Sequence, residues 1–511
     1  MSEANGRRHV QRALGVEAIS MTKRFGEFLA LDNVSLKVAP ASFHALLGEN
    51  GAGKSTLVKC IMGYYQPDGG EVIVGGRERT IGNPRAAHAL GLGMVYQHFT
   101  LVPAMTVTEN LVLARDELPA IIDWRKETKE LEAFLDQMPF RVPLGAKVSA
   151  ISAGERQKCE ILKQLYLKRG FLILDEPTSV LTPGEADEVL GMLRGLVTRG
   201  ELTILMITHK FREVMAFADE VTILRRGKLA GQGEVKSLTP DAMARSMIGA
   251  ERLTVQPARS GDFGAPRLTI SSLAAFDDAG QAAVRGVSLT VRSGEIVGVA
   301  GVSGNGQRQL VEVLAGQREA ESGMILMGGE PYHATRQEMR RNHLSVLPEE
   351  PLKNACVARM SVADNLALRD FDQAPFAVGG WWLDHGRIRE QAERQIGRYR
   401  IKTRSYDTPI GELSGGNIQR AVLARELGGE VEIMVATNPC FGLDFAAVAQ
   451  IRAEIMAARN RGAAVLLVSE DLDELLELAD RILVIFSGQF VYEARAGEAD
   501  LTEIGRHMAG H

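Results

Sequence analysis

The segment GENGAGKST, residues 48–56, has the residue types and spacing of a loop that binds phosphate. The apolar run FHALLG leads into it and the helix-forming run STLVKCIMG follows. Its glycines let the backbone curl so that N–H groups face a phosphate, and the helix N-terminus adds its positive end. We expect Lys54 to bridge β- and γ-phosphates and the Ser55 hydroxyl to bind Mg²⁺. The predicted nucleotide ligands of the loop are Gly48, Asn50, Gly51, Gly53, Lys54, Ser55 and Thr56.

A pair of carboxylates follows the apolar run FLIL, within FLILDEP at residues 171–177. Asp175, at the end of the expected strand, is placed to reach Mg²⁺ through water. Glu176 is placed to orient or deprotonate the water that attacks a γ-phosphate. Together with the phosphate loop, the pair predicts hydrolysis of a nucleoside triphosphate.

Short apolar runs alternate with helical stretches along the chain. Residues 171–176, 203–208 and 220–227 are typical of buried parallel strands, whereas residues 185–200 have the pattern of an amphipathic helix. This alternation predicts an α/β fold, with helices covering the faces of a mainly parallel sheet.

The chain also repeats itself. ALDNVSLKV from Ala30 recurs as AVRGVSLTV from Ala283, 253 positions later, whereas LDEPTSVLT recurs around Pro439 at an offset of 262. The change in offset predicts an insertion of about nine residues in the second copy, near Phe376. The predicted organisation is a flexible tail (1–16), a first domain (17–251), a linker rich in Gly, Pro and Ser (252–266) and a second domain (267–511).

Composition narrows the function classes. Of the 511 residues, 45% are hydrophobic, which excludes disorder throughout, and the net charge of −5 argues against nucleic acid as the main partner. The N-terminal stretch lacks the apolar run of a secretion signal, and the longest apolar runs are too short to span a bilayer. The four cysteines form no CxxC pair. We therefore expect neither a zinc site nor a disulfide framework, and a cytoplasmic location.

Two further segments carry a family resemblance. ISAGERQKCEILKQL, about twenty residues before Asp175, and LSGGNIQRAVLARELGG in the second copy resemble the signature sequence of ATP-binding cassette (ABC) proteins. The resemblance implies tandem P-loop cassettes, each with a RecA-like α/β core, an antiparallel β subdomain and a helical subdomain. It implies ATP and Mg²⁺ as cofactors. Gln97 would sense Mg²⁺ and the γ-phosphate, His209 would contact the γ-phosphate, and Phe25 would stack on adenine.

The second copy has lost the residues that carry this chemistry. The aligned changes are Lys54 to Gln307, Ser55 to Arg308, Thr56 to Gln309, Gln97 to Glu349, Asp175 to Thr437, Glu176 to Asn438 and His209 to Glu470. The second site thus lacks the phosphate-binding ammonium group, two Mg²⁺ ligands and the candidate base, and it gains two carboxylates that repel phosphate. We expect weak or no nucleotide binding there.

The signature sequences show the opposite pattern, because the second copy has the intact signature and the first copy has the altered one. ABC domains pair head to tail, so the resemblance implies that each phosphate loop is closed by the partner domain's signature. The intact Ser414, Gly415 and Gly416 would complete the site at Lys54, whereas the degenerate loop would face the SAGE sequence that contains Ala153. The sequence therefore predicts one competent composite site and one degenerate site.

The second-copy sequences GNGQ, NPCFGLD and SEDLDE resemble the ATP-binding subunit of bacterial importers for simple sugars and nucleosides. That resemblance implies two transmembrane permease subunits, docked on residues 98–110 and 350–365, and an extracytoplasmic substrate-binding protein. The chain would lie on the cytoplasmic face of the inner membrane, without nucleic acid and without direct contact with the cargo. The alternative is a soluble twin-cassette ATPase acting on ribosomes or DNA. The short linker, the degenerate second site and the absence of CxxC modules argue against it.

Overall fold

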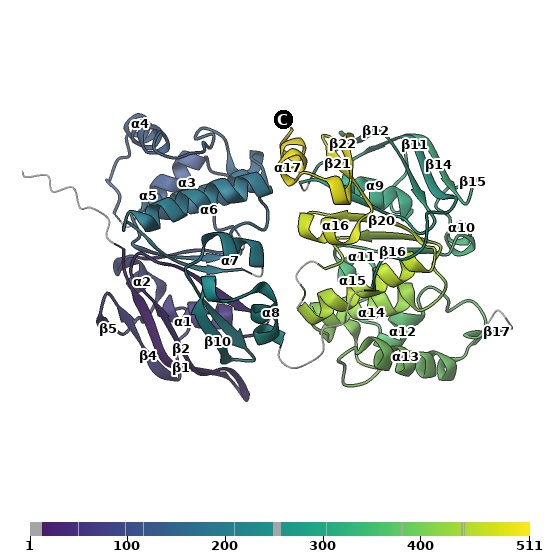
Figure 1. Cartoon of the computed structure of the whole chain (residues 1–511), viewed down its shortest axis with the longest axis horizontal. Coiled ribbons are helices and arrows are strands. Elements are labelled where there is room, and N and C mark those ends of the chain that lie inside the picture. The colour runs from purple at the N-terminus through teal and green to yellow at the C-terminus, as the bar shows by residue number, and fades with distance from the viewer. Residues whose placement is uncertain are drawn as a thin grey trace, which may run out of the picture. The chain divides into compact units, whose positions relative to one another are not determined.

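The computed structural model describes residues 13–49, 51–97, 99–115, 117–208, 210–248, 257–302, 304–379, 382–440, 443 and 445–510. The chain divides into two compact units, with the boundary between residues 251 and 252 (Figure 1). Unit 1 contains the intact phosphate loop and unit 2 contains its degenerate copy.

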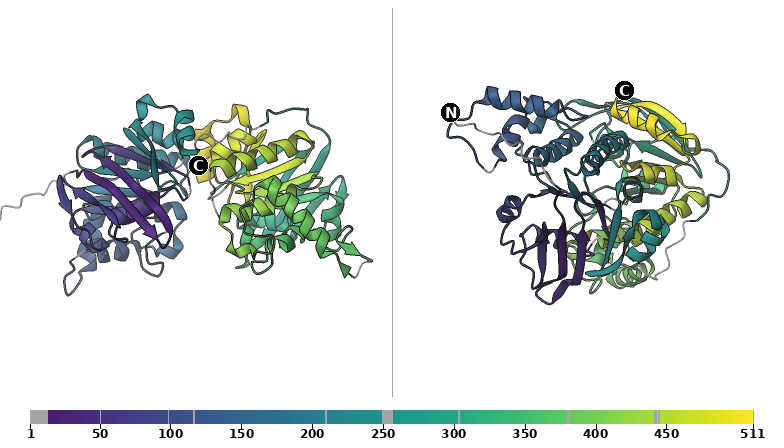
Figure 2. Two further views of the ribbon diagram at one scale, coloured as in Figure 1. Left: turned by 90° about the horizontal axis from the view of Figure 1, so that it is seen from below. Right: turned by 60° about the vertical axis from the view of Figure 1, so that its left-hand side comes forward.

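Unit 1 is built on a six-stranded sheet in the order β10-β9-β3-β8-β7-β6, in which all strands but the edge strand β10 are parallel. A four-stranded antiparallel sheet has the order β2-β1-β4-β5, and its strands are purple in Figure 2. The strands are β1 (Val16–Phe25), β2 (Phe28–Val38), β3 (Phe43–Gly48), β4 (Gly69–Val74), β5 (Arg77–Arg79), β6 (Leu92–Val95), β7 (Phe171–Asp175), β8 (Thr203–Ile207), β9 (Glu220–Arg225) and β10 (Lys228–Glu234). The helices are α1 (Lys54–Ile61), α2 (Pro84–Ala89), α3 (Val107–Leu113), α4 (Trp124–Leu135), α5 (Ala153–Tyr166), α6 (Pro183–Thr198), α7 (Phe211–Phe217) and α8 (Pro240–Ile248), with 3-10 turns at Val148–Ala150 and Val235–Ser237.

Unit 2 repeats this architecture. Its main sheet has the order β16-β19-β20-β13-β21-β22 and its antiparallel sheet the order β12-β11-β14-β15. The strands are β11 (Pro266–Phe276), β12 (Ala282–Arg292), β13 (Ile296–Ala300), β14 (Ser322–Met327), β15 (Glu330–Pro331), β16 (Leu344–Leu347), β17 (Ala377–Val378), β18 (Trp382–Leu383), β19 (Ile433–Thr437), β20 (Ala464–Ser469), β21 (Arg481–Phe486) and β22 (Gln489–Arg495). The helices are α9 (Gln307–Leu314), α10 (Arg336–Arg341), α11 (Pro351–Asn354), α12 (Val362–Ala367), α13 (His385–Tyr399), α14 (Gly415–Leu427), α15 (Phe445–Asn460), α16 (Leu472–Leu478) and α17 (Leu501–Ala509), with 3-10 turns at Ile410–Glu412 and Ala496–Glu498.

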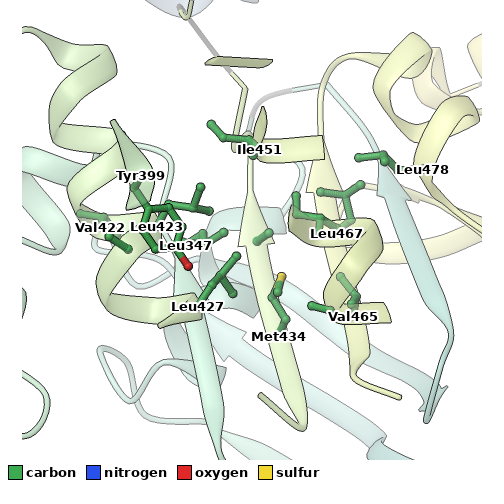
Figure 3. Close-up of a cluster of buried hydrophobic side chains, with 14 of the residues drawn as sticks. Leu347, Tyr399, Val422, Leu423, Leu427, Met434, Ile451, Val465, Leu467 and Leu478 are labelled. Atoms are coloured by element: carbon green, nitrogen blue, oxygen red, sulfur yellow. The ribbon is translucent and has the colours of Figure 1, made fainter. Parts of the chain in front are cut away.

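Each main sheet is buried on both faces, which is why its strands have continuous apolar sequences. In β7, Phe171 and Ile173 face the cluster shared with α1 and the antiparallel sheet, whereas Leu172 and Leu174 face the cluster shared with α3, α4 and α5. Unit 2 has the same two layers. In Figure 3, Met434 of β19 lies between side chains of α14 and those of β20. The α/β cassette architecture, the parallel strands and the helix at residues 185–200 are confirmed.

The predicted insertion is divided between two places. Leu92 and Leu344, which begin β6 and β16, are 252 positions apart, and the helical residues Asn110 and Asn365 are 255 positions apart. The interval between them is therefore three residues longer in unit 2, and it contains α11. A larger addition lies between α12 and α13, where the β17–β18 hairpin forms close to Phe376 as predicted.

The predicted tail and linker both include residues that pack on a unit. Residues 1–12 lie outside the described part of the chain, but Ala13 donates its N–H to the carbonyl of Gly200 and β1 begins at Val16. The tail predicted over residues 1–16 therefore ends before Ala13. In the linker, the Arg259 guanidinium donates to the carbonyl of Ala479 over 2.7 Å. The described part of the linker is thus held against unit 2.

His44 is buried in β3 of unit 1, 2.8 Å from the Thr222 hydroxyl, and burial lowers its pKa to about 4. The unfolded chain takes up a proton near pH 6.5, so His44 should cost unit 1 about 2 kcal/mol of stability between pH 7 and pH 5. The aligned positions in unit 2 are Val297 and Leu483. We predict that the double substitution H44V/T222L removes this part of the acid sensitivity. Thermal unfolding of variant and native chain at both pH values tests it. An unchanged pH dependence would contradict it.

Candidate functional site

The phosphate loop of unit 1 runs from the end of β3 to the start of α1. Gly53 has a φ of 103°, and a Cβ there would lie 2.9 Å from the carbonyl oxygen of Ala30. Gly48 is equally constrained, because its Cβ would lie 2.5 Å from the carbonyl oxygen of Leu224. Only glycine fits these two positions, so the motif spacing is required by the fold of the loop. The predicted ligand Asn50 lies outside the described residues.

Lys54 is the first residue of α1, and its ammonium group lies within the loop. It donates to the carbonyl oxygens of Gly48, over 2.6 Å, and Glu49, over 3.1 Å. Burial lowers the pKa of Lys54 from its ordinary value, and the carboxylates of Glu176, Asp175 and Glu49 oppose that shift. The ammonium group is therefore desolvated and surrounded by acceptors, an arrangement ready to bind a phosphate oxygen.

The carboxylate pair lies at the carboxyl end of β7. Asp175 ends the strand, and Glu176 follows in a left-handed conformation with a φ of 49°. The Glu176 N–H donates to the carbonyl of Ile207 at the end of β8. The Gln97 carboxamide donates to the Glu176 carboxylate over 3.3 Å. The structure thus brings Gln97, Asp175, Glu176 and Lys54 to one edge of the sheet, whereas His209 lies outside the described residues.

The remaining predicted ligands of unit 1 surround this edge. Ser55 is exposed and Thr56 half-buried in the first turn of α1. Phe25 ends β1 with 43% of its surface exposed, and the edge of its ring contacts Tyr65 at a centroid distance of 5.2 Å. An exposed ring supported from one side can stack on a base. Tyr65, which the sequence motifs did not single out, supplies that support.

In unit 2 the corresponding loop is closed by its own side chain. Gln307 begins α9 after Gly306, which has a φ of 102°, as Lys54 begins α1 after Gly53. The Gln307 carboxamide donates to the carbonyl of Val302 over 3.1 Å and accepts the N–H of Asn305 over 3.1 Å. A Cβ on Gly301 would lie 2.4 Å from the Gln307 amide nitrogen. A lysine cannot accept an N–H, so this closure is specific to the glutamine.

Six of the seven substituted residues of unit 2 line one cavity of about 210 Å³. Its lining includes Gln307, Arg308, Glu349, Thr437, Asn438 and Glu470. Asn438 has a φ of 42° and donates its N–H to Val468, which reproduces the backbone of Glu176 without its carboxylate. Arg308 stands at the position of Ser55, the predicted Mg²⁺ ligand, and its guanidinium is paired with Glu312 at 2.6 Å.

The two signature helices begin differently. Ser152 caps α5 and accepts the N–H of Glu155, while the Glu155 carboxylate accepts the N–H of Ser152. This capping box places a negative charge on the helix N-terminus. In α14, among the described residues, the Ser414 side chain makes no cap bond to the helix backbone. It instead accepts the Asn417 carboxamide over 2.8 Å. The first turn of α14 also contains no acidic residue, so its N-terminus suits an anion better than that of α5.

Comparison with known proteins identifies the family to which the chain belongs. The ABC transporter family model matches residues 31–179 and 284–440, one match in each unit. The chain belongs to the ABC transporter family. It is an ABC transporter ATPase with two cassettes, as the motifs predicted, and membership implies ATP binding.

Relatives match almost all of this ABC protein. A glucose import ATP-binding protein of Haloferax volcanii is 38% identical over 96% of this chain and 95% of its own. A guanosine import ATP-binding protein of Bacillus subtilis is 37% identical over 97% of each chain. A nucleoside import ATP-binding protein of Lactococcus lactis subsp. cremoris is also 37% identical, over 97% of this chain and 98% of its own.

Among solved structures, the archaeal ribosome recycling factor in complex with a ribosomal stalk protein matches 92% of this chain and 88% of its own, with a TM-score of 0.60 and 20% identity. At that identity the likeness shows the fold alone. None of the helices described for the two cassettes is long and apolar enough to cross a bilayer.

Besides Tyr65, two carboxylates that bear on these motifs were not predicted from the sequence. The Glu155 carboxylate on the first signature helix is one. Its signal was available, because Ser152 and Glu155 have the spacing of a capping box. The other is the buried carboxylate of Glu213 in α7, which accepts the hydroxyl of Thr178, two residues after Glu176. A glutamate inside a short amphipathic helix gives no signal of its own.

The structures of the two phosphate loops predict how substitutions of Lys54 and Gln307 affect the affinity for ATP. Lys54→Gln should weaken ATP binding by about 10- to 100-fold, because it removes a charge-assisted bond and supplies an amide that can close the loop. Gln307→Ala should leave ATP affinity unchanged. Titration calorimetry with ATP measures both. Equal losses in the two variants would contradict the assignment of binding to the first cassette.

Proposed function

We propose that this chain is the ATP-hydrolysing subunit of an importer for nucleosides or simple sugars, and that it hydrolyses ATP at a single site. One observation carries the proposal. Gln97, Lys54 and Glu176 converge in the first cassette, whereas Gln307 closes the equivalent loop in the second. The relatives are named for the import of glucose, guanosine and nucleosides, which supports the cargo class.

Hydrolysis in the first cassette needs a base, a phosphate ligand and a positioned water. Glu176 would accept the proton of the attacking water, since its carboxylate is held at the strand end by its backbone bond to Ile207. Lys54 would stabilise charge on the β- and γ-phosphates. His209 would contact the γ-phosphate from the end of β8. Asn438, an amide, cannot act as such a base in the second cassette.

The donor set in the first cassette fits Mg²⁺. The Ser55 hydroxyl, the Asp175 carboxylate and the Gln97 carbonyl are hard oxygen ligands. Gln97 donates from its nitrogen to Glu176, which leaves its carbonyl oxygen as the atom for a metal. Bound Mg²⁺ would neutralise phosphate charge. The aligned Arg308, Thr437 and Glu349 make no such set, because an arginine adds positive charge beside the metal position.

We further propose that the competent site is completed by Ser414, Gly415 and Gly416 of the second cassette. The N-termini of the two signature helices support this assignment. The Glu155 carboxylate caps the N-terminus of α5, whereas the first turn of α14 contains no acidic residue. A γ-phosphate would be repelled at the first and bound at the second. Gly415 has open space where a Cβ would stand, so the fold does not require glycine there.

Residues 98–110 and 350–365 are proposed to dock two permease subunits. In the described part of each segment, an asparagine braces an exposed loop. Asn110 bonds both backbone groups of Val102, and Asn365 bonds both backbone groups of Val357. Val102 and Val357 are 45% and 46% exposed. A rigid loop with an apolar residue at its surface suits docking against another protein.

These docking segments are tied to the signature helices. In the first cassette, the Glu160 carboxylate of α5 accepts the Thr100 hydroxyl, and Lys163 donates to the same hydroxyl over 2.6 Å. In the second, Arg425 of α14 donates to the carbonyls of Ala355 and Asn365. A permease that moves either segment would therefore move a signature helix, which is how transport would couple to ATP. An extracytoplasmic binding protein would deliver the cargo at the other side of the permeases, and the chain would lie on the cytoplasmic face of the membrane.

The one-site proposal predicts unequal effects of two substitutions at equivalent positions. Glu176→Gln should bind ATP and lower the hydrolysis rate by about 100- to 10,000-fold, because the base is lost. Asn438→Ala should leave hydrolysis largely intact. Phosphate release measures both. If Asn438→Ala abolished activity as fully as Glu176→Gln, the one-site proposal would be wrong.

A second pair tests the signature assignment. Gly415→Asp places a carboxylate on the N-terminus of α14, which is compatible with the helix but repels phosphate. We expect a loss of hydrolysis of about a hundredfold. Ala153→Asp, at the equivalent position of α5, is the control and should have no effect. Inactivation by Ala153→Asp alone would reverse the assignment. Sedimentation of the chain with ribosomes would instead favour the alternative of a soluble twin-cassette ATPase.

A further inference from the structure

A buried carboxylate lies behind the catalytic turn of the first cassette. Glu213 of α7 is 3% exposed. One of its oxygens accepts the hydroxyl of Thr178, and the other accepts the hydroxyl of Thr208 over 3.1 Å. Both threonines are at least 97% buried. A buried carboxylate requires such partners, so the three side chains form one unit in the core.

This unit joins two turns that are far apart in sequence. Thr178 comes two residues after Glu176, and Thr208 comes directly after β8. Lys210 strengthens the junction, because its ammonium group lies 3.7 Å from Glu213 and donates to the Thr178 carbonyl over 3.3 Å. Its N–H also donates to the Thr208 hydroxyl. The segments that follow β7 and β8 are thus joined to each other through Glu213 and Lys210.

Both turns need such support. Glu176 has a φ of 49°, a backbone conformation that a residue with a side chain keeps only when its surroundings impose it. Thr208 immediately precedes His209, the predicted γ-phosphate contact. Because a shift of 1 Å in a reacting group costs about a hundredfold in rate, a tie that sets both residues affects catalysis without touching ATP.

The second cassette has an equivalent group of side chains around Glu474, in which one of the two hydroxyl donors is replaced by a thiol. Glu474 is 1% exposed and accepts the Ser469 hydroxyl over 2.7 Å, and the thiol of Cys440 lies near enough to influence its pKa. Burial raises the pKa of Glu474. Cys440 stands where the first cassette has Thr178, and a thiol is a weak donor. Glu474 therefore occupies the same buried position as Glu213, in the cassette that we propose does not hydrolyse ATP.

We propose that Glu213 is a positioning residue for ATP hydrolysis, which holds the Glu176 turn against the segment that begins at Thr208. The proposal rests on the proposed function of Glu176. It assigns to Glu213 an effect on turnover and none on ATP affinity, because Lys54 and the phosphate loop belong to other elements.

The test compares Glu213→Gln with Glu474→Gln in the full chain, with ATP turnover and ATP affinity measured separately. Glu213→Gln turns one acceptor oxygen into a donor and should lower kcat by about 10- to 100-fold, with KM for ATP unchanged. Glu474→Gln is the matched control and should leave both constants unchanged. Thermal unfolding reports any loss of fold in either variant.

A second series covers the case in which Glu213→Gln does not fold. Thr178→Ser keeps the hydroxyl and should retain kcat, whereas Thr178→Val and Thr178→Cys should lower it with KM unchanged. Equal kcat in the serine and valine variants, or equal effects of Glu213→Gln and Glu474→Gln, would overturn the proposal. Glu176→Gln in the same assay separates the two claims. If that variant keeps turnover, the proposed function fails, whatever Glu213 does.

Discussion

The chemistry of this protein depends on which side chain enters the loop at the end of the first core strand. A lysine there can only donate, so Lys54 binds loop carbonyls and keeps a positive charge beside the phosphate position. A glutamine both donates and accepts, so Gln307 closes its loop upon itself. The two backbones are alike at this point, with φ values of 103° and 102° at the glycine before the helix. The two loops thus share one backbone conformation and differ in the hydrogen bonds that this side chain makes.

The duplicated fold shows that backbone geometry and chemistry are maintained separately. The left-handed residue that follows β7 in one cassette and β19 in the other is Glu176 and Asn438, respectively, with φ values of 49° and 42°. A buried glutamate supports each turn, as Glu213 or Glu474. These features hold the ends of the strands together, whatever the side chain at the site. The second cassette therefore keeps the backbone framework of the strand ends without the Glu176 carboxylate.

Sequence patterns predicted most of the framework, because glycine positions and apolar strands are local signals. Lys54, Asp175 and Glu176 were placed by motif spacing, and the structure brings them to one edge. Features set by tertiary contacts were not predictable. The N-terminal boundary depends on a bond from Ala13 to Gly200, distant in sequence. The closure by Gln307 depends on where its amide points, which spacing does not show.

We propose that each chain has one competent nucleotide site. The most direct measurement counts the ATP bound at saturation by the assembled transporter carrying Glu176→Gln, which is expected to bind without turnover. Equilibrium dialysis with labelled ATP gives that number per chain. With one competent site, we expect one ATP per chain. Adding Lys54→Gln to Glu176→Gln should weaken this binding, whereas adding Gln307→Ala should leave it unchanged. Two ATP per chain, or one that depends on Gln307, would contradict it.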